Sequence, residues 1–80
     1  MKIDLSNTVI LLTGATGGIG AAAAKLLAKN NATVALHFNQ NFKRVRLLAK
    51  ELGHNSRPFQ ADLTNARECA ALFKKVVDRY

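Results

Sequence analysis

Apolar residues along this chain alternate between short unbroken runs and longer stretches in which they recur every three or four residues. An unbroken run is typical of a parallel strand covered on both faces, and the wider spacing is typical of a helix with one buried face. The pattern predicts strands at 8–13, 33–38 and 57–61. It predicts helices at 19–30, 41–52 and 64–80, so strands and helices alternate throughout.

Several residues mark where the predicted helices start and stop. Asn30 and Asn31 are expected to end the first helix, because Asn tolerates the left-handed conformation, and Gly53 to cap the second. Asn65 and Glu68 have the spacing of a capping box at the start of the third. The predicted core stripes of the second and third helices are Phe42, Val45, Leu48, Ala49, Leu52 and Cys69, Leu72, Phe73, Val76, Tyr80.

The βαβαβα order predicts an α/β fold with a parallel sheet and right-handed crossovers. In nucleotide-binding sheets of this kind the first three strands lie in the order 3-2-1, and a fourth covers the free side of the first. Without that fourth strand, the apolar strand at 9–12 would be an open edge, which proteins usually cover. We therefore expect residues 1–80 to be one unit without an internal boundary, the first half of a larger doubly wound fold.

The composition is that of an ordinary globular α/β protein, with 49% hydrophobic and 21% charged residues. It is too apolar for a disordered segment, and no apolar run approaches the length of a membrane span. The N-terminus lacks the pattern of a secretory signal. The single Cys69 cannot form an internal disulfide, which fits a cytoplasmic protein, and it is expected to be a small core residue rather than a reactive thiol.

Twelve Lys and Arg against five Asp and Glu give a net charge of +7. Such an excess attracts phosphate groups on a nucleotide, a nucleic acid or an anionic membrane, although the basic run at 43–50 is equally well read as a solvated helix face. Nucleic-acid binding is disfavoured because the run lacks interleaved aromatic residues, and no membrane partner is expected. His37 and His54 are far apart without neighbouring ligands, so we expect structural or solvent-facing roles and no metal site.

A glycine-rich turn joins the first predicted strand to the first helix. Gly14, Gly18 and Gly20 allow a sharp turn that exposes backbone N–H groups, and the helix behind them points the positive end of its dipole the same way. This arrangement is typical of a site for the pyrophosphate of a dinucleotide. The alternative is a tight strand-to-helix turn that binds no ligand.

Three segments together resemble the short-chain dehydrogenase/reductase family. Thr-Gly-Ala-Thr-Gly-Gly-Ile-Gly at 13–20 resembles its Thr-Gly-x-x-x-Gly-x-Gly fingerprint. Ala-Thr-Val-Ala-Leu-His-Phe-Asn at 32–39 resembles the second strand of ketoacyl-carrier-protein-reductase-like and pteridine-reductase-like members. Gln-Ala-Asp-Leu-Thr at 60–64 resembles the end of the third strand, beside the adenine. The resemblance implies a Rossmann-type fold and a nicotinamide cofactor.

The resemblance also implies a role for each matching residue. Asp62 would accept a hydrogen bond from the adenine amino group with Leu63 alongside, while Phe38 and Asn39 would lie at the adenosine ribose or its phosphate. Thr16 has an alternative role as the cap of the first helix, and Asp62 as a turn residue. The residues implied around the pyrophosphate and ribose are Gly14, Thr16, Gly17, Gly18, Ile19 and Gly20.

The end of the second strand bears on the choice of cofactor. Family members that use NAD place a carboxylate there to bind the ribose hydroxyls, and residues 37–41 contain none. With Lys43 and Arg44 just beyond, NADP is favoured over NAD. The sequence departs from many NADP-dependent members at Gly17, where those carry a basic residue.

The family's catalytic Tyr-x-x-x-Lys pair does not occur in these 80 residues, whose single tyrosine is Tyr80. We therefore expect no catalytic residue and no activity in this stretch alone. The resemblance implies a longer oxidoreductase that transfers hydride between the nicotinamide and a carbonyl or alcohol substrate, as a homo-oligomer. The alternative is a non-catalytic dinucleotide-binding or regulatory module.

Overall fold

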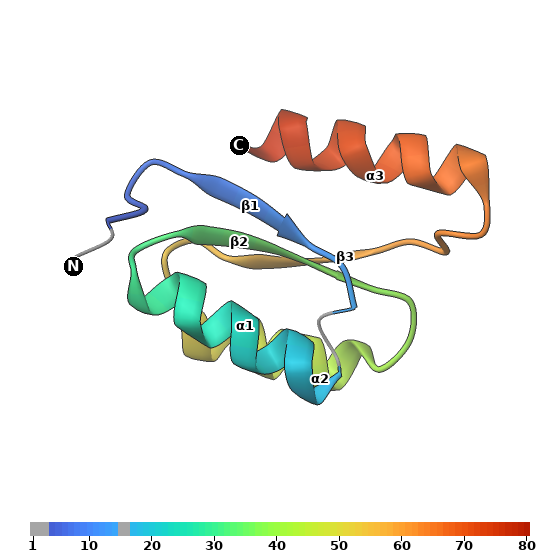
Figure 1. The fold of residues 1–80 in the computed structure, drawn as a ribbon. Helices are drawn as coiled ribbons and strands as arrows, with labels where there is room; N and C mark the ends of the chain where they lie inside the picture. The colour runs from blue at the N-terminus through green and yellow to red at the C-terminus, as the bar shows by residue number, and fades with distance from the viewer. Residues whose placement is uncertain (1–3, 15–16) are drawn as a thin grey trace.

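The computed structural model describes residues 4–14 and 17–80. Strands and helices alternate along it, which confirms the six predicted elements with ends shifted by at most two residues (Figure 1). The elements are β1 (Val9–Leu12), α1 (Gly18–Lys29), β2 (Thr33–Phe38), α2 (Phe42–Leu52), β3 (Arg57–Gln60) and α3 (Ala66–Arg79). None of the helices in these ranges is long and apolar enough to cross a membrane.

The three strands form one parallel sheet in the order β1-β2-β3. The central strand β2 pairs with β1 from Val9↔Thr33 onward and with β3 up to Phe38↔Gln60. This confirms the predicted order 3-2-1 and leaves β1 at an edge, where Val9 is 42% exposed.

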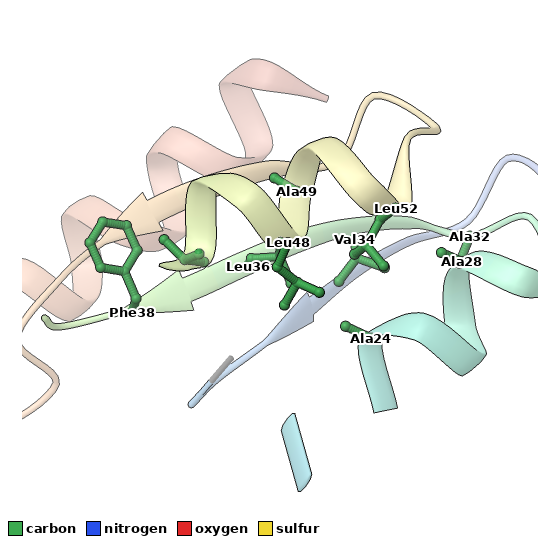
Figure 2. Close-up of a cluster of buried hydrophobic side chains, with 10 residues drawn as sticks. Ala24, Ala28, Ala32, Val34, Leu36, Phe38, Leu48, Ala49 and Leu52 are labelled. Carbon is green, nitrogen blue, oxygen red and sulfur yellow. The ribbon is translucent and has the colours of Figure 1, made fainter. Parts of the chain in front are cut away.

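The helices divide between the two faces of the sheet, with α1 and α2 on one face and α3 on the other (Figure 1). Side chains alternate along β2, so Val34, Leu36 and Phe38 meet α1 and α2 (Figure 2), while Ala35 meets α3. Both faces of β2 are therefore buried, which explains its unbroken apolar run. The main core consists of Ala24, Ala28, Ala32, Val34, Leu36, Phe38, Val45, Leu48, Ala49 and Leu52.

The core on the α3 face is smaller: Ala35, Ala61, Leu72 and Val76 are its buried members. The predicted burial of Phe73 is wrong, since its side chain is 66% exposed. It lies on the side of α3 toward β1, where it lines a hollow of about 480 Å³ that also includes Val9 and Tyr80.

Three further stripe residues depart from full burial, and one of them is Tyr80, which is 36% exposed at the end of α3. The predicted burial of Phe42 is wrong, because its ring lies at the first turn of α2 and is 53% exposed. It packs on the rim of the core against Phe38, with ring centroids 5.6 Å apart. Cys69 is half-buried, and its thiol donates to the Leu63 carbonyl at 3.3 Å.

The helix ends follow the predictions, with one exception. Asn31 (φ +73°) and Gly53 (φ +67°) adopt the positive φ expected after α1 and α2. The side chain of Asn65 caps α3 by accepting from the N–H groups of Arg67 and Glu68 at 2.9 and 3.3 Å.

The reciprocal half of the predicted capping box is wrong. The N–H of Asn65 already donates to the Asp62 carbonyl at 3.0 Å. The Glu68 carboxylate instead accepts from the N–H of Asp62, also at 3.0 Å.

Candidate functional site

The three segments singled out in the sequence meet at the carboxyl edge of the sheet. Because the strands are parallel and in register, the residues that follow β1, β2 and β3 emerge side by side. Direct contacts join them: the Gly14 N–H lies 3.4 Å from the His37 imidazole, and the Gln60 amide lies 3.4 Å from Asn39. This is the edge of an open parallel sheet where ligands bind.

The turn after β1 depends on Gly14, whose φ of +69° a side chain would strain. The Gly14 carbonyl accepts from the Gly17 N–H at 3.3 Å, and Gly17 is the N-cap of α1. A Cβ added at Gly14 or Gly18 would meet no heavy atom of the described residues within 4 Å. Thr16, predicted as a cofactor or capping residue, lies outside the described residues.

The first turn of α1 is well suited to bind an anion. It carries no acidic residue, and no side chain of the described segments caps it. The helical hydrogen bonds start with Ala21, which donates to Gly17, so Gly18, Ile19 and Gly20 bring N–H groups without helical partners. The Ile19 side chain is 90% exposed at the same end. A helix of 12 residues places partial positive charge there.

At the end of β2, the side chain of Phe38 is buried and that of Asn39 is exposed to the candidate site. The Phe38 side chain is 5% exposed and belongs to the core, so this residue offers the site its backbone rather than its ring. Asn39 is exposed, and both its carbonyl and its side-chain oxygen lie 3.4 Å from the Gln60 amide nitrogen. Lys43 and Arg44 follow as exposed residues of the first turn of α2, which carries no acid.

At the end of β3, Asp62 holds the turn that leads into α3. Its Oδ1 accepts from the Thr64 hydroxyl at 2.7 Å and from the Thr64 N–H at 3.0 Å. These hydrogen bonds, the hydroxyl first, lower the pKa of the Asp62 carboxyl below its usual value. The side chain is therefore an ionised acceptor at neutral pH, and Leu63 stands beside it, 43% exposed.

One side chain at this edge was not predicted to belong to the site. His37 is 5% exposed and lies between the turn after β1 and the end of β3. The alternative of a solvent-facing role is wrong, and the structural role is confirmed. The only signal in the sequence is a histidine within an apolar run, which does not identify its partners.

A model of the family described as short chain dehydrogenase matches residues 8–80. The chain belongs to this family. Two similar proteins are nodulation protein G of Rhizobium sp. (strain N33) and the 3-oxoacyl-acyl-carrier-protein reductase FabG of Rickettsia typhi. The chain is 40% identical to the first over 72 residues and 38% identical to the second over 74.

The solved structures agree with the family assignment. A dehydrogenase/reductase from Sinorhizobium meliloti 1021 superimposes with a TM-score of 0.91 at 30% identity, over 98% of this chain. The chain spans 29% and 30% of the two sequence relatives and 32% of that structure. Members of the short-chain dehydrogenase family are oxidoreductases that use a nicotinamide dinucleotide.

Proposed function

We propose that residues 1–80 bind the adenosine and pyrophosphate part of NADP in a reductase of the short-chain family. The observation that carries the proposal is the start of α1, where Gly18, Ile19 and Gly20 precede the first helical hydrogen bond and a Cβ at Gly18 would meet no described heavy atom within 4 Å. Dinucleotides carry their paired negative charges at the pyrophosphate, which is the group such a helix start binds.

In this proposal each strand end has its own part of the cofactor. Gly14, Gly17, Gly18, Ile19 and Gly20, with Thr16 assigned from the family resemblance, surround the pyrophosphate. Asn39 and the Phe38 backbone lie at the adenosine ribose. Oδ2 of Asp62, which has no hydrogen-bond partner within the described segments, accepts from the adenine amino group, and Leu63 packs alongside.

The preference for NADP rests on charge. Residues 37–41 and the first turn of α2 bring no carboxylate that would repel a 2′-phosphate, while Lys43 and Arg44 are exposed there. We expect NADPH to bind more tightly than NADH in fluorescence titrations of the purified protein. The ratio of the affinity for NADPH to the affinity for NADH should fall in the Lys43→Gln/Arg44→Gln variant.

The control for this experiment removes the same charge elsewhere. Lys74→Gln/Lys75→Gln lowers the net charge equally on α3 and should leave the ratio unchanged. Equal affinity of the unaltered protein for NADPH and NADH contradicts the assignment of NADP, and binding of neither contradicts the proposed site.

The reaction proposed for the longer protein is reduction of a carbonyl group by hydride from NADPH, in a homo-oligomer in the cytoplasm. Its basis is the likeness to a relative named as a 3-oxoacyl-acyl-carrier-protein reductase. The competing proposal is a dinucleotide-binding module without catalysis. NADPH oxidation in the presence of a 3-oxoacyl thioester distinguishes the two, since the module binds NADPH without consuming it.

A further inference from the structure

His37 occupies a position from which it contacts two sides of the proposed site at once. It projects from β2 on the face that carries α3, and its ring is buried. Nδ1 lies 3.4 Å from the Gly14 nitrogen, in the turn after β1, and Nε2 lies 2.9 Å from the Ala61 carbonyl oxygen, one residue before Asp62.

The two contacts require the same form of the imidazole. The Gly14 N–H is a donor, so Nδ1 must carry a lone pair, and the Ala61 carbonyl is an acceptor, so Nε2 must carry the proton. One neutral tautomer satisfies both partners. The Gly14 N–H is thereby used within the protein, which leaves the N–H groups at the start of α1 to meet the pyrophosphate.

Among the residues that the structure describes, the end of β3 is anchored independently of His37, but the turn after β1 is not. The Ala61 N–H donates to the Phe38 carbonyl at 3.0 Å and the Asp62 N–H to Glu68 at 3.0 Å. On the other side, the paired register of β1 ends at Leu12, and within residues 4–14 and 17–80 the contact that ties Gly14 to the sheet is the one with His37. The imidazole thus links the turn after β1 to the anchored end of β3 and fixes the distance between them.

We propose that His37 is a positioning residue for the dinucleotide: it holds the Gly14 turn, and with it the start of α1, at a fixed distance from the adenine side of the site. This inference rests on the proposed function. The residue touches no part of the cofactor itself, so its effect appears as lost affinity through Gly14 and not through a missing cofactor contact.

Substituting His37 by either of two amide side chains tests the two contacts one at a time. Asn at position 37 places an amide oxygen near the site of Nδ1, so His37→Asn can keep the Gly14 link. Gln reaches the site of Nε2, so His37→Gln can keep only the Ala61 link. Each variant leaves one backbone group without its protein partner, and because Ala61 is buried while Gly14 is exposed to water, His37→Asn is expected to lose more stability than His37→Gln.

The test compares NADPH affinity of the purified protein, corrected for the folded fraction measured by circular dichroism. We expect His37→Gln to bind about tenfold more weakly, the effect of one lost hydrogen bond, and His37→Asn to stay within about threefold of the unaltered protein. His54→Gln, a change at the exposed second histidine, should alter neither affinity nor stability. Equal affinities of the Asn and Gln variants overturn the positioning role.

A second readout does not depend on the cofactor. In nitrogen-15 NMR spectra, His37 should be the neutral tautomer protonated at Nε2, and the Gly14 amide resonance should shift in His37→Gln but stay in place in His37→Asn. A different tautomer, or the same Gly14 shift in both variants, refutes the link itself. If the link is present and the unaltered protein binds no dinucleotide, it is the proposed function that fails.

Discussion

Replacing single glycines by alanine separates the backbone role of the turn from its binding role. Gly14 has a φ of +69° and Gly18 is the first residue of α1, yet a Cβ at either one meets no described protein atom within 4 Å. Neither substitution clashes with the part of the chain that the structure describes. Their effects on stability and on affinity can therefore be worked out separately.

The expected changes in stability have opposite signs. Gly14→Ala forces an alanine into the left-handed region, which costs about 1–2 kcal/mol. Gly18→Ala replaces a poor helix former by the best one at an open position and should stabilise the protein by about 0.5 kcal/mol. For a chain of 80 residues, whose total stability is about 4–12 kcal/mol, neither change unfolds the protein.

The expected changes in affinity have the same sign. In the proposed complex the pyrophosphate occupies the space that either Cβ would enter, so both variants should bind NADPH at least about tenfold more weakly, equivalent to about 1.4 kcal/mol. Thermal unfolding followed by circular dichroism gives the stability, where each kcal/mol shifts Tm by about 4–8 °C. Fluorescence titration of NADPH gives the affinity.

Gly53 provides the matched control. It has a φ of +67° and equally open surroundings, but it caps α2 at the opposite edge of the sheet. Gly53→Ala should lose at least as much stability as Gly14→Ala, because its ψ of −145° lies outside the left-handed well, while it binds NADPH normally. If Gly18→Ala is stabilised and still binds NADPH as tightly as the unaltered protein, the space in front of α1 is not the pyrophosphate site and the reasoning is refuted.

Two further predictions concern the segment that leads into α3. Thr64→Val removes the hydroxyl that holds the pKa of Asp62 down, so that pKa should rise toward its ordinary value in an NMR titration; Thr33→Val, which removes a hydroxyl bonded to the His54 carbonyl, should leave it unchanged. Because the folded pKa of Asp62 is depressed, the stability from this turn is present at neutral pH and is lost as the pH falls through that pKa, and Thr64→Val should weaken this acid sensitivity. Asn65→Ala should cost about 1 kcal/mol in thermal unfolding through loss of the α3 cap, whereas Asn65→Asp, which keeps an acceptor at the helix start, should cost much less.

The sequence predicts those parts of the structure that depend on local signals. Strand and helix periods, the left-handed Asn31 and the cap at Asn65 depend on neighbours within a few residues, and each is confirmed. The glycine turn at 14–20 stands out from the residue types alone, whereas the role of Asp62 comes from the family resemblance. Their positions at one edge of the sheet follow once the strands are parallel.

What the sequence did not predict depends on segments far apart in the chain. The bond from His37 to Gly14 spans 23 residues and the bond to Ala61 spans 24, so neither leaves a local pattern. Helical spacing likewise gives Phe73 a place on the apolar stripe but not the element that would cover it. Glu68 has the right spacing for a capping box, and only the path of the preceding loop gives it a different partner.

The unequal division of the core gives the two faces of the sheet different resistance to opening. Apart from the terminal Tyr80, whose hydroxyl donates to the Asn55 carbonyl at 2.8 Å, α3 is held mainly by Leu72 and Val76, whereas α1 and α2 share the larger core with β2. Helix α3 should therefore detach in brief local unfolding events that leave the rest of the sheet intact. Asp62 lies in the turn that leads into this helix, so an adenine bound to it would suppress those events. Cofactor binding would then slow the hydrogen exchange of the α3 backbone amides.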